Sequence, residues 1–182
     1  AMRQTIQRAV LGAFFAGGLL GFADDQPKAE TFKVSAQTFF KPAKWKVEKT
    51  TSRMRAAQFS VPGKAGEAKA EGVFFYFGPG QAGGAQANLK RWAGQFATAP
   101  KPKVEVKEAK VNDIPVAYLF GTGSLMVGPP FGAKVKKDNY SMAAAVLGTK
   151  PGYLFVKMTG PKAVVDAARA DFQKMVESGL KK

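Results

Sequence analysis

The chain has 182 residues, of which 28 are basic and 13 are acidic, so its net charge is +15. It contains neither histidine nor cysteine. This composition excludes catalytic triads and dyads that need either residue, a disulfide framework, thiolate zinc sites and iron–sulfur ligation. Hydrophobic residues make up 46% and aromatic residues 12% of the chain, values typical of a globular domain rather than a disordered one.

The first 23 residues have the pattern of an export signal. Arg3 and Arg8 form a basic start, and an uncharged, largely apolar run of 14 residues follows. That run is shorter than the ~20 residues of a membrane-spanning helix, and Gly21 and Ala23 are small residues at the positions that signal peptidase prefers. We therefore predict a signal peptide over residues 1–23, cleaved after Ala23, and an exported product, periplasmic or extracellular, that does not span a membrane. A buried or membrane-anchoring helix is the alternative interpretation.

The polar residues 24–37 predict a flexible tether, and residues 38–182 predict one domain. Alternation along residues 55–61 predicts a strand with Ala57, Phe59 and Val61 on one face. The aromatic run at residues 72–77 has high strand propensity. Because turn-forming residues separate the two runs, we expect them to pair as an antiparallel hairpin.

Two helices and four more strands are expected in the rest of the chain. Residues 85–97 predict a helix, and the proline of a Gly-Pro pair, Pro161, suits the first position of a second one. The apolar stripes of the two helices are Leu89, Trp92, Ala93 and Phe96, and Val164, Val165, Ala168, Phe172, Met175 and Val176. The predicted strands are the region around Val104 and Val106, and residues 114–122, 140–147 and 153–158.

Strands outnumber helices and occur in runs, which indicates the α+β class. We expect an antiparallel or mixed sheet of about five to seven strands with helices packed against it. The short turn at Pro151 and Gly152 predicts that the strands on either side of it are neighbours in the sheet.

Residues 78–83 match the pattern G-x-G-x-x-G, between a predicted strand and a predicted helix. The pattern suggests phosphate binding at a helix N-terminus, but the next acids, Glu105 and Glu108, lie beyond the ~20-residue offset of a ribose-binding carboxylate. No parallel βαβ unit surrounds it either. A turn with positive φ is the favoured interpretation, and a simple anion site is the alternative. The candidate anion-binding residues are Gly78, Gly80, Gly83 and Gly84.

Residues 121–133 predict a long loop rich in glycine and proline that nevertheless carries large apolar side chains. Such side chains either fold back over the core, which is the favoured interpretation, or are offered to a partner. The candidate partner-binding residues are Leu125, Met126, Val127 and Phe131.

Of the 28 basic residues, 22 are lysines, and they are spread along the chain with concentrations at residues 41–55, 101–110 and 134–137. A solvated surface is the first interpretation, since lysine also protects edge strands from aggregation. An anionic envelope surface or an acidic protein partner comes second. Nucleic acid comes last, because no stacking motif of the RNA-binding type accompanies the lysines.

The segments at residues 54–62, 74–80, 88–96 and 155–161 occur in an order that resembles a set of small exported bacterial proteins, mostly uncharacterised. With Phe40, Pro42 and Trp45 at its start, this succession also resembles the PsbP-like fold, named after an extrinsic photosystem II subunit. The resemblance implies α/β/α layers and a non-enzymatic accessory or docking module. Members of that fold proposed to bind metals use histidine, which this chain lacks, so we expect neither a metal nor another cofactor.

Our leading hypothesis is therefore a non-catalytic binding or accessory module that docks on a protein partner or an anionic envelope surface. A small-anion binder that uses the glycine turn is the first rival. A hydrolase that uses only carboxylates is the second, although none of the 13 acids forms a recognisable constellation.

Overall fold

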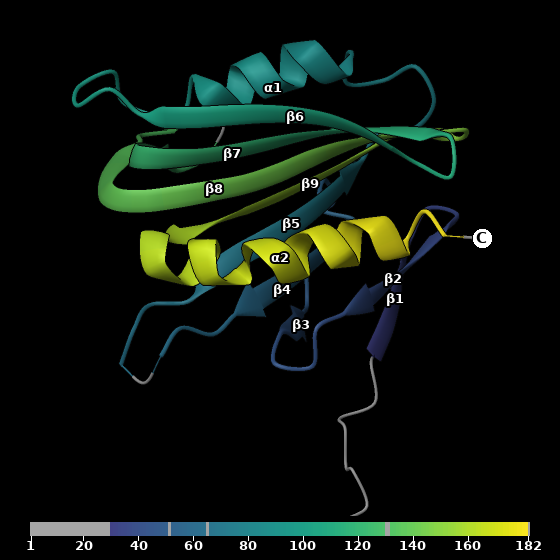
Figure 1. The fold of residues 1–182 in the computed structure, drawn as a ribbon, viewed down its shortest axis with the longest axis horizontal. Coiled ribbons are helices and arrows are strands. Elements are labelled where there is room, and N and C mark those ends of the chain that lie inside the picture. The colour runs from purple at the N-terminus through teal and green to yellow at the C-terminus, as the bar shows by residue number, and fades with distance from the viewer. Residues whose placement is uncertain (1–29, 51, 65, 130–131, 182) are drawn as a thin grey trace, which may run out of the picture.

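The computed structural model describes residues 30–50, 52–64, 66–129 and 132–181. The predicted signal peptide and the first part of the predicted tether lie outside the described residues. The described chain forms one large sheet between two helices, with a small hairpin beside it (Figure 1).

The large sheet has seven strands in the order β3-β4-β5-β9-β8-β7-β6, and all neighbouring strands are antiparallel. Its strands are β3 (Lys46–Glu48), β4 (Ala57–Val61), β5 (Ala70–Tyr76), β6 (Lys103–Val111), β7 (Ile114–Val127), β8 (Val135–Thr149) and β9 (Gly152–Pro161). The predicted hairpin of the first two runs is confirmed as β4 and β5. The predicted adjacency across the Pro151 turn is confirmed as well, because β8 pairs with β9 from Thr149 and Gly152 onward.

Helix α2 (Lys162–Ser178) covers one face of the sheet and encloses the larger part of the core. All six residues of its predicted stripe are buried. They pack on the inward side chains of the strands, such as Phe74 and Val156, both 0% exposed. Pro161 is the residue just before the helix rather than its first residue, because its φ and ψ are those of extended chain that still pairs with β8.

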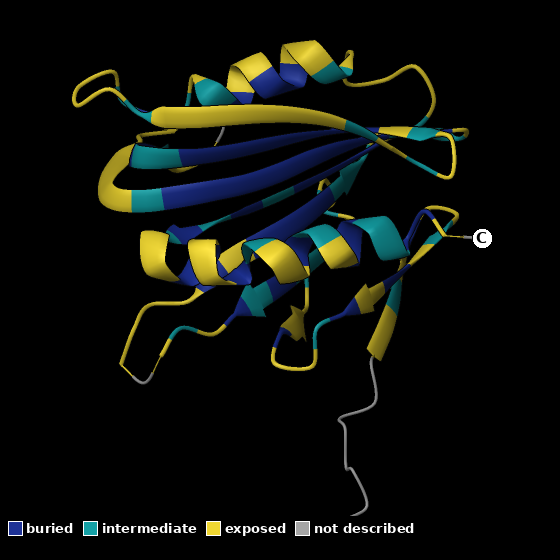
Figure 2. Ribbon diagram, in the orientation of Figure 1, coloured by how far each residue is buried: buried dark blue, intermediate teal, exposed yellow. Residues whose placement is uncertain are grey.

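Helix α1 (Ala85–Ala93) covers part of the opposite face, over β7 and β8. Leu89, Trp92 and Phe96 are buried there, so the predicted stripe is correct. The helix ends earlier than predicted, at Ala93, and Phe96 reaches the sheet from the following turn through a bridge to Leu125. The central strands are buried on both faces, whereas β6 at the edge is exposed along most of its length (Figure 2).

The tether prediction is wrong for residues 30–37. These residues belong to a separate antiparallel hairpin of β1 (Glu30–Val34) and β2 (Gln37–Lys41). The ring of Phe32 stacks on Phe39 at 5.6 Å and meets Phe74 edge-on at 5.3 Å. Phe32 and Val34 are enough to attach β1 to the domain, although the residues around them are polar. The reason is that the main core, with the rings of Phe39 and Phe74, supplies an apolar surface for them.

The loop prediction is wrong for residues 121–127. Strand β7 continues through them to Val127, with an irregularity in its pairing to β8 between Gly123 and Leu125. The glycines permit close packing here rather than a turn, since a Cβ on Gly121 would lie 2.5 Å from the Phe96 ring.

Candidate functional site

The glycine segment forms a turn between β5 and α1, as predicted. Gly78, Gly80 and Gly83 all have positive φ, at 91°, 69° and 72°. Gly84 precedes the first residue of α1 with extended backbone and offers no side chain to cap the helix. Because the first turn of α1 also has no acidic residue, its N–H groups lack a local carboxylate. Anion binding at these glycines stays a prediction.

An open groove of about 660 Å³ lies between this turn and one face of α1. Its lining residues are Phe77, Gln81, Ala82, Ala87, Asn88 and Arg91. The Asn88 amide donates to the carbonyl oxygens of Ala82 and Gly84, at 2.8 and 3.0 Å, and so ties the turn to the helix. The Asn88 carbonyl oxygen accepts from Arg91 Nη2 at 2.5 Å, which orients the guanidinium.

The sequence pattern predicted the glycines of the turn but not the side chains of α1, Asn88 and Arg91, that line the groove beside it. Asn88 and Arg91 are one helical turn apart, so they lie on the same face of α1. This spacing was the feature of the sequence that could have identified the two residues, because it places both on the helix face next to the buried stripe of Leu89 and Trp92. Phe77 was predicted only as part of the aromatic run, but it is 38% exposed and contributes a ring to the groove.

The candidate partner-binding residues are not equivalent in the structure. Leu125 is 1% exposed and packs in the core under α1, so the fold-back interpretation is correct for it. Met126 is partly buried, and Val127, at 37%, is the exposed one of the described three. Phe131 lies outside the described residues. Partner binding by Met126 and Val127 stays a prediction.

Strand β6 is the long open edge of the sheet. Among the described residues, its nine positions pair with β7 alone, and the edge at the other end of the sheet, β3, has three residues. Val104 and Val106 are 39% and 50% exposed. Glu105 accepts from Arg169 at 2.8 Å and Glu108 from Gln86 at 2.6 Å. Ion pairs within 4 Å are absent for Lys103, Lys107 and Lys110 in the described part of the chain.

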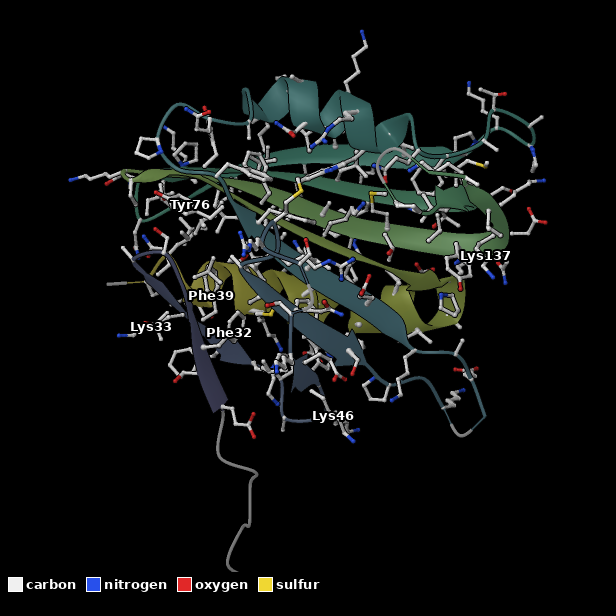
Figure 3. All side chains as sticks on the ribbon, turned by 180° about the vertical axis from the view of Figure 1, so that it is seen from behind. Phe32, Lys33, Phe39, Lys46, Tyr76 and Lys137 are labelled. Atoms are coloured by element: carbon white, nitrogen blue, oxygen red, sulfur yellow. The ribbon has the colours of Figure 1, made fainter. Side chains whose placement is uncertain are left out.

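Other exposed lysines lie on elements other than β6. Figure 3 shows Lys33, Lys46 and Lys137 on separate elements. Lys41 is 4% exposed and does not contribute to the surface. Its ammonium donates to the carbonyl oxygen of Trp45 and lies 3.2 Å from Glu30.

The described residues contain no cluster of three or more acidic side chains that could hold a metal ion. None of the described helices combines the length and apolar character needed to cross a membrane.

No protein-family model matches the sequence, and no curated protein matches it. The solved structures that match this fold include the following two. PA94 from Pseudomonas aeruginosa, a protein of unknown function, has 10% identity and a TM-score of 0.49, with 85% of this chain and 97% of that chain covered. Cyanobacterial PsbP (CyanoP) from Synechocystis sp. PCC 6803 has 12% identity and a TM-score of 0.53, with 92% and 96% covered. Together with the seven-stranded antiparallel sheet and its two helices, the second likeness shows that the chain has a PsbP-like α+β fold.

Proposed function

We propose that this protein is an exported, non-catalytic accessory module that docks on an acidic protein partner through strand β6. An anionic envelope surface is the other class of partner that a basic exported module can use. The observation that supports the protein partner is the open edge of β6, because an extended segment can add a strand there and satisfy its main-chain hydrogen bonds.

The side chains of β6 favour an acidic, partly apolar segment. Glu105 is paired with Arg169 and Glu108 accepts a hydrogen bond from Gln86. Among the described residues, no carboxylate lies within 4 Å of the ammonium groups of Lys103, Lys107 and Lys110. The exposed Val104 and Val106 lie on the other face from Glu105 and offer apolar contacts in alternation with the charges. The PsbP-like fold is compatible with an accessory role.

The test reverses the charges of β6. The triple variant Lys103→Glu, Lys107→Glu and Lys110→Glu is compared with a control, Lys64→Glu, Lys69→Glu and Lys150→Glu, which changes the net charge equally at exposed positions elsewhere. Affinity capture from the native envelope fraction, at low and high salt, should recover one acidic protein with the wild type and the control but not with the β6 variant. Equal loss of capture by both variants would show that docking depends on net charge alone, and full capture by both would show that the β6 lysines are not needed; either result would contradict the assignment to β6.

The second proposed function is the binding of a small anion in the groove beside α1. It is supported by Arg91, whose guanidinium lines the groove and is held by Asn88 rather than by a carboxylate. Inorganic phosphate should then raise the melting temperature when ionic strength is held constant with sodium chloride. The same rise with chloride alone would contradict a specific site.

A further inference from the structure

Alternate residues of β6 direct their main-chain hydrogen-bonding groups to the open edge of the sheet. Asn112 and Asp113, between β6 and β7, both have positive φ, at 49° and 64°, so the two strands are joined by a two-residue type I′ turn. The pair beside such a turn, Val111 and Ile114, exchanges both of its main-chain hydrogen bonds within the hairpin. Because these pairs alternate along the strand, the N–H and C=O groups of the even-numbered residues of β6, with Val106 at their centre, point away from β7.

A second copy of the same strand can close this edge. β6 is exposed along most of its length (Figure 2), and an open edge of that kind otherwise invites uncontrolled strand addition. Two copies related by a two-fold axis perpendicular to the sheet run antiparallel, and each satisfies the free main-chain groups of the other. The assembly then stops at two copies, because no free edge of β6 remains.

The charges of β6 favour one register of this pairing. With the axis at Val106, Glu105 of each copy lies opposite Lys107 of the other, and no two like charges lie opposite each other along residues 103–109. An axis at Lys107 would place that lysine opposite itself, and an axis at Glu105 would do the same to a carboxylate. Registers centred nearer the ends of the strand pair fewer residues. The charges therefore exclude the neighbouring registers and leave the one at Val106.

We propose that two copies of this chain pair antiparallel through β6, with the two-fold axis at Val106. Val106 then exchanges main-chain hydrogen bonds with Val106 of the second copy, and Val104 exchanges them with Glu108 of that copy. Glu105 and Lys107 occupy the non-hydrogen-bonded positions between them, where opposite Cα atoms are about 4.5 Å apart and side chains approach most closely.

The side chains that meet across the axis are accessible. The Glu105 carboxylate contacts Arg169 through Oε2, and its side chain is 56% exposed, so Oε1 can accept from Lys107 of the second copy. Among the described residues, no carboxylate lies within 4 Å of the Lys107 ammonium. Val106 is 50% exposed on the other face of the sheet and gains an apolar contact with its own copy.

Self-pairing goes beyond the docking function proposed above and does not rest on it. Where both occur, it regulates docking, because an acidic partner has to displace the second copy from the same edge.

Sedimentation equilibrium near physiological ionic strength should show a reversible monomer–dimer equilibrium. At that ionic strength, the net positive charges of the two copies are screened beyond about 8 Å. Lys107→Glu should weaken dimerisation by about tenfold, because it replaces two opposite-charge pairs with two like-charge pairs. The matched control, Lys103→Glu, makes the same charge change on the same face of β6, opposite Ala109 of the second copy, and should not weaken it.

A mixing experiment tests the register. Glu105→Lys should also weaken the dimer on its own, by placing two lysines opposite each other at each pair. An equimolar mixture of the Lys107→Glu and Glu105→Lys variants should recover dimers that contain one copy of each, because both cross-strand pairs then join opposite charges. The contact with Arg169 that Glu105→Lys removes lies within one copy, so it is absent from monomer and dimer alike. No recovery on mixing would overturn the register at Val106.

Cross-linking locates the axis independently. Because the chain has no cysteine, one introduced thiol reports whether that position faces itself in the dimer. Val106→Cys should cross-link through a short bifunctional thiol reagent, whereas Lys110→Cys should not, since its two copies lie about 27 Å apart in this register. Equal cross-linking of both variants would contradict a dimer centred at Val106.

The dimer and the docking function fail separately. A wild type that remains monomeric up to about 1 mM would overturn self-pairing and leave docking at β6 standing. Glu105→Lys keeps every lysine of β6 and frees the edge, so it should capture the acidic protein at least as well as the wild type does. A dimer that Lys107→Glu weakens, with no acidic protein captured by the wild type or by Glu105→Lys, would support self-pairing and overturn docking.

Discussion

The hydroxyl of Tyr118 is a buried polar atom without a hydrogen-bond partner among the described residues. Burial raises the pKa of Tyr118 above its ordinary value of 10.0. Since an unpaired buried hydroxyl costs about 1–3 kcal/mol, Tyr118→Phe should raise the free energy of unfolding by about 1 kcal/mol. The matched control is Tyr76→Phe, which removes a hydroxyl that donates to the Pro151 carbonyl at 2.7 Å and should lower that free energy by a similar amount.

Urea unfolding of the two tyrosine variants checks this difference of sign. The wild type should also lose stability above about pH 10, where the unfolded chain ionises Tyr118 and the folded chain does not. Tyr118→Phe should lose less over the same range. Equal destabilisation by both variants would mean that the Tyr118 hydroxyl has a favourable partner after all.

For Lys157, the free energy of unfolding should depend on pH in the opposite direction to that expected for Tyr118. Its pKa in the folded protein is about 8, against the ordinary 10.5, so between these values the unfolded chain holds a proton that the folded chain has lost. The contribution of this group to the free energy of unfolding therefore rises with pH across that window. Lys157→Met should be more stable than the wild type by about 1–3 kcal/mol near neutral pH.

That advantage should shrink as the pH approaches about 10.5, where the wild-type penalty has been relieved. Chemical denaturation at the two ends of the window, in the absence of phosphate, measures it. A difference that does not change with pH would mean that lost packing or new packing, and not charge burial, explains the effect.

At the scale of the elements, the β1–β2 hairpin allows a test of how much the packing of Phe32 on the core contributes to the free energy of unfolding. Phe32 is partly buried against the Phe39 and Phe74 rings, while Phe40, on the same hairpin, is 52% exposed. Phe32→Ala should lower the free energy of unfolding by about 1–3 kcal/mol, because it removes aromatic contacts from the edge of the core. Phe40→Ala should change it by less than about 0.5 kcal/mol. Thermal unfolding followed by circular dichroism compares them, and similar values for both would favour the tether interpretation.

The whole molecule combines a strong positive charge with a predicted export signal. If residues 1–23 are removed, 26 basic and 13 acidic residues remain, a net charge of +13. Expression with an intact export pathway should yield a product that begins at Asp24, because small residues precede that position. Intact-mass measurement of the exported fraction checks the cleavage site. A product that retains Arg3 and Arg8 would favour the anchoring-helix alternative.

Local patterns in the sequence determined most of the elements. The alternation of Ala57, Phe59 and Val61 and the spacing of Leu89 and Trp92 each depend on neighbours within a few residues, so strand, helix and buried face could all be predicted. The class of fold followed from the order of these elements. The glycine turn was predictable for the same reason, since positive φ is a local preference.

Only the tertiary structure decided which residues meet. Phe32 forms a strand because the Phe39 and Phe74 rings lie beside it, and residues 121–127 extend β7 because the Phe96 ring needs a surface without a Cβ at Gly121. The Lys157 ammonium donates to the Gln95 side chain at 3.1 Å, although the two residues are 62 positions apart in the chain. The composition excluded histidine and cysteine chemistry from the start, but the charge of +15 says nothing of where cations lack counterions, because that depends on distances between distant residues.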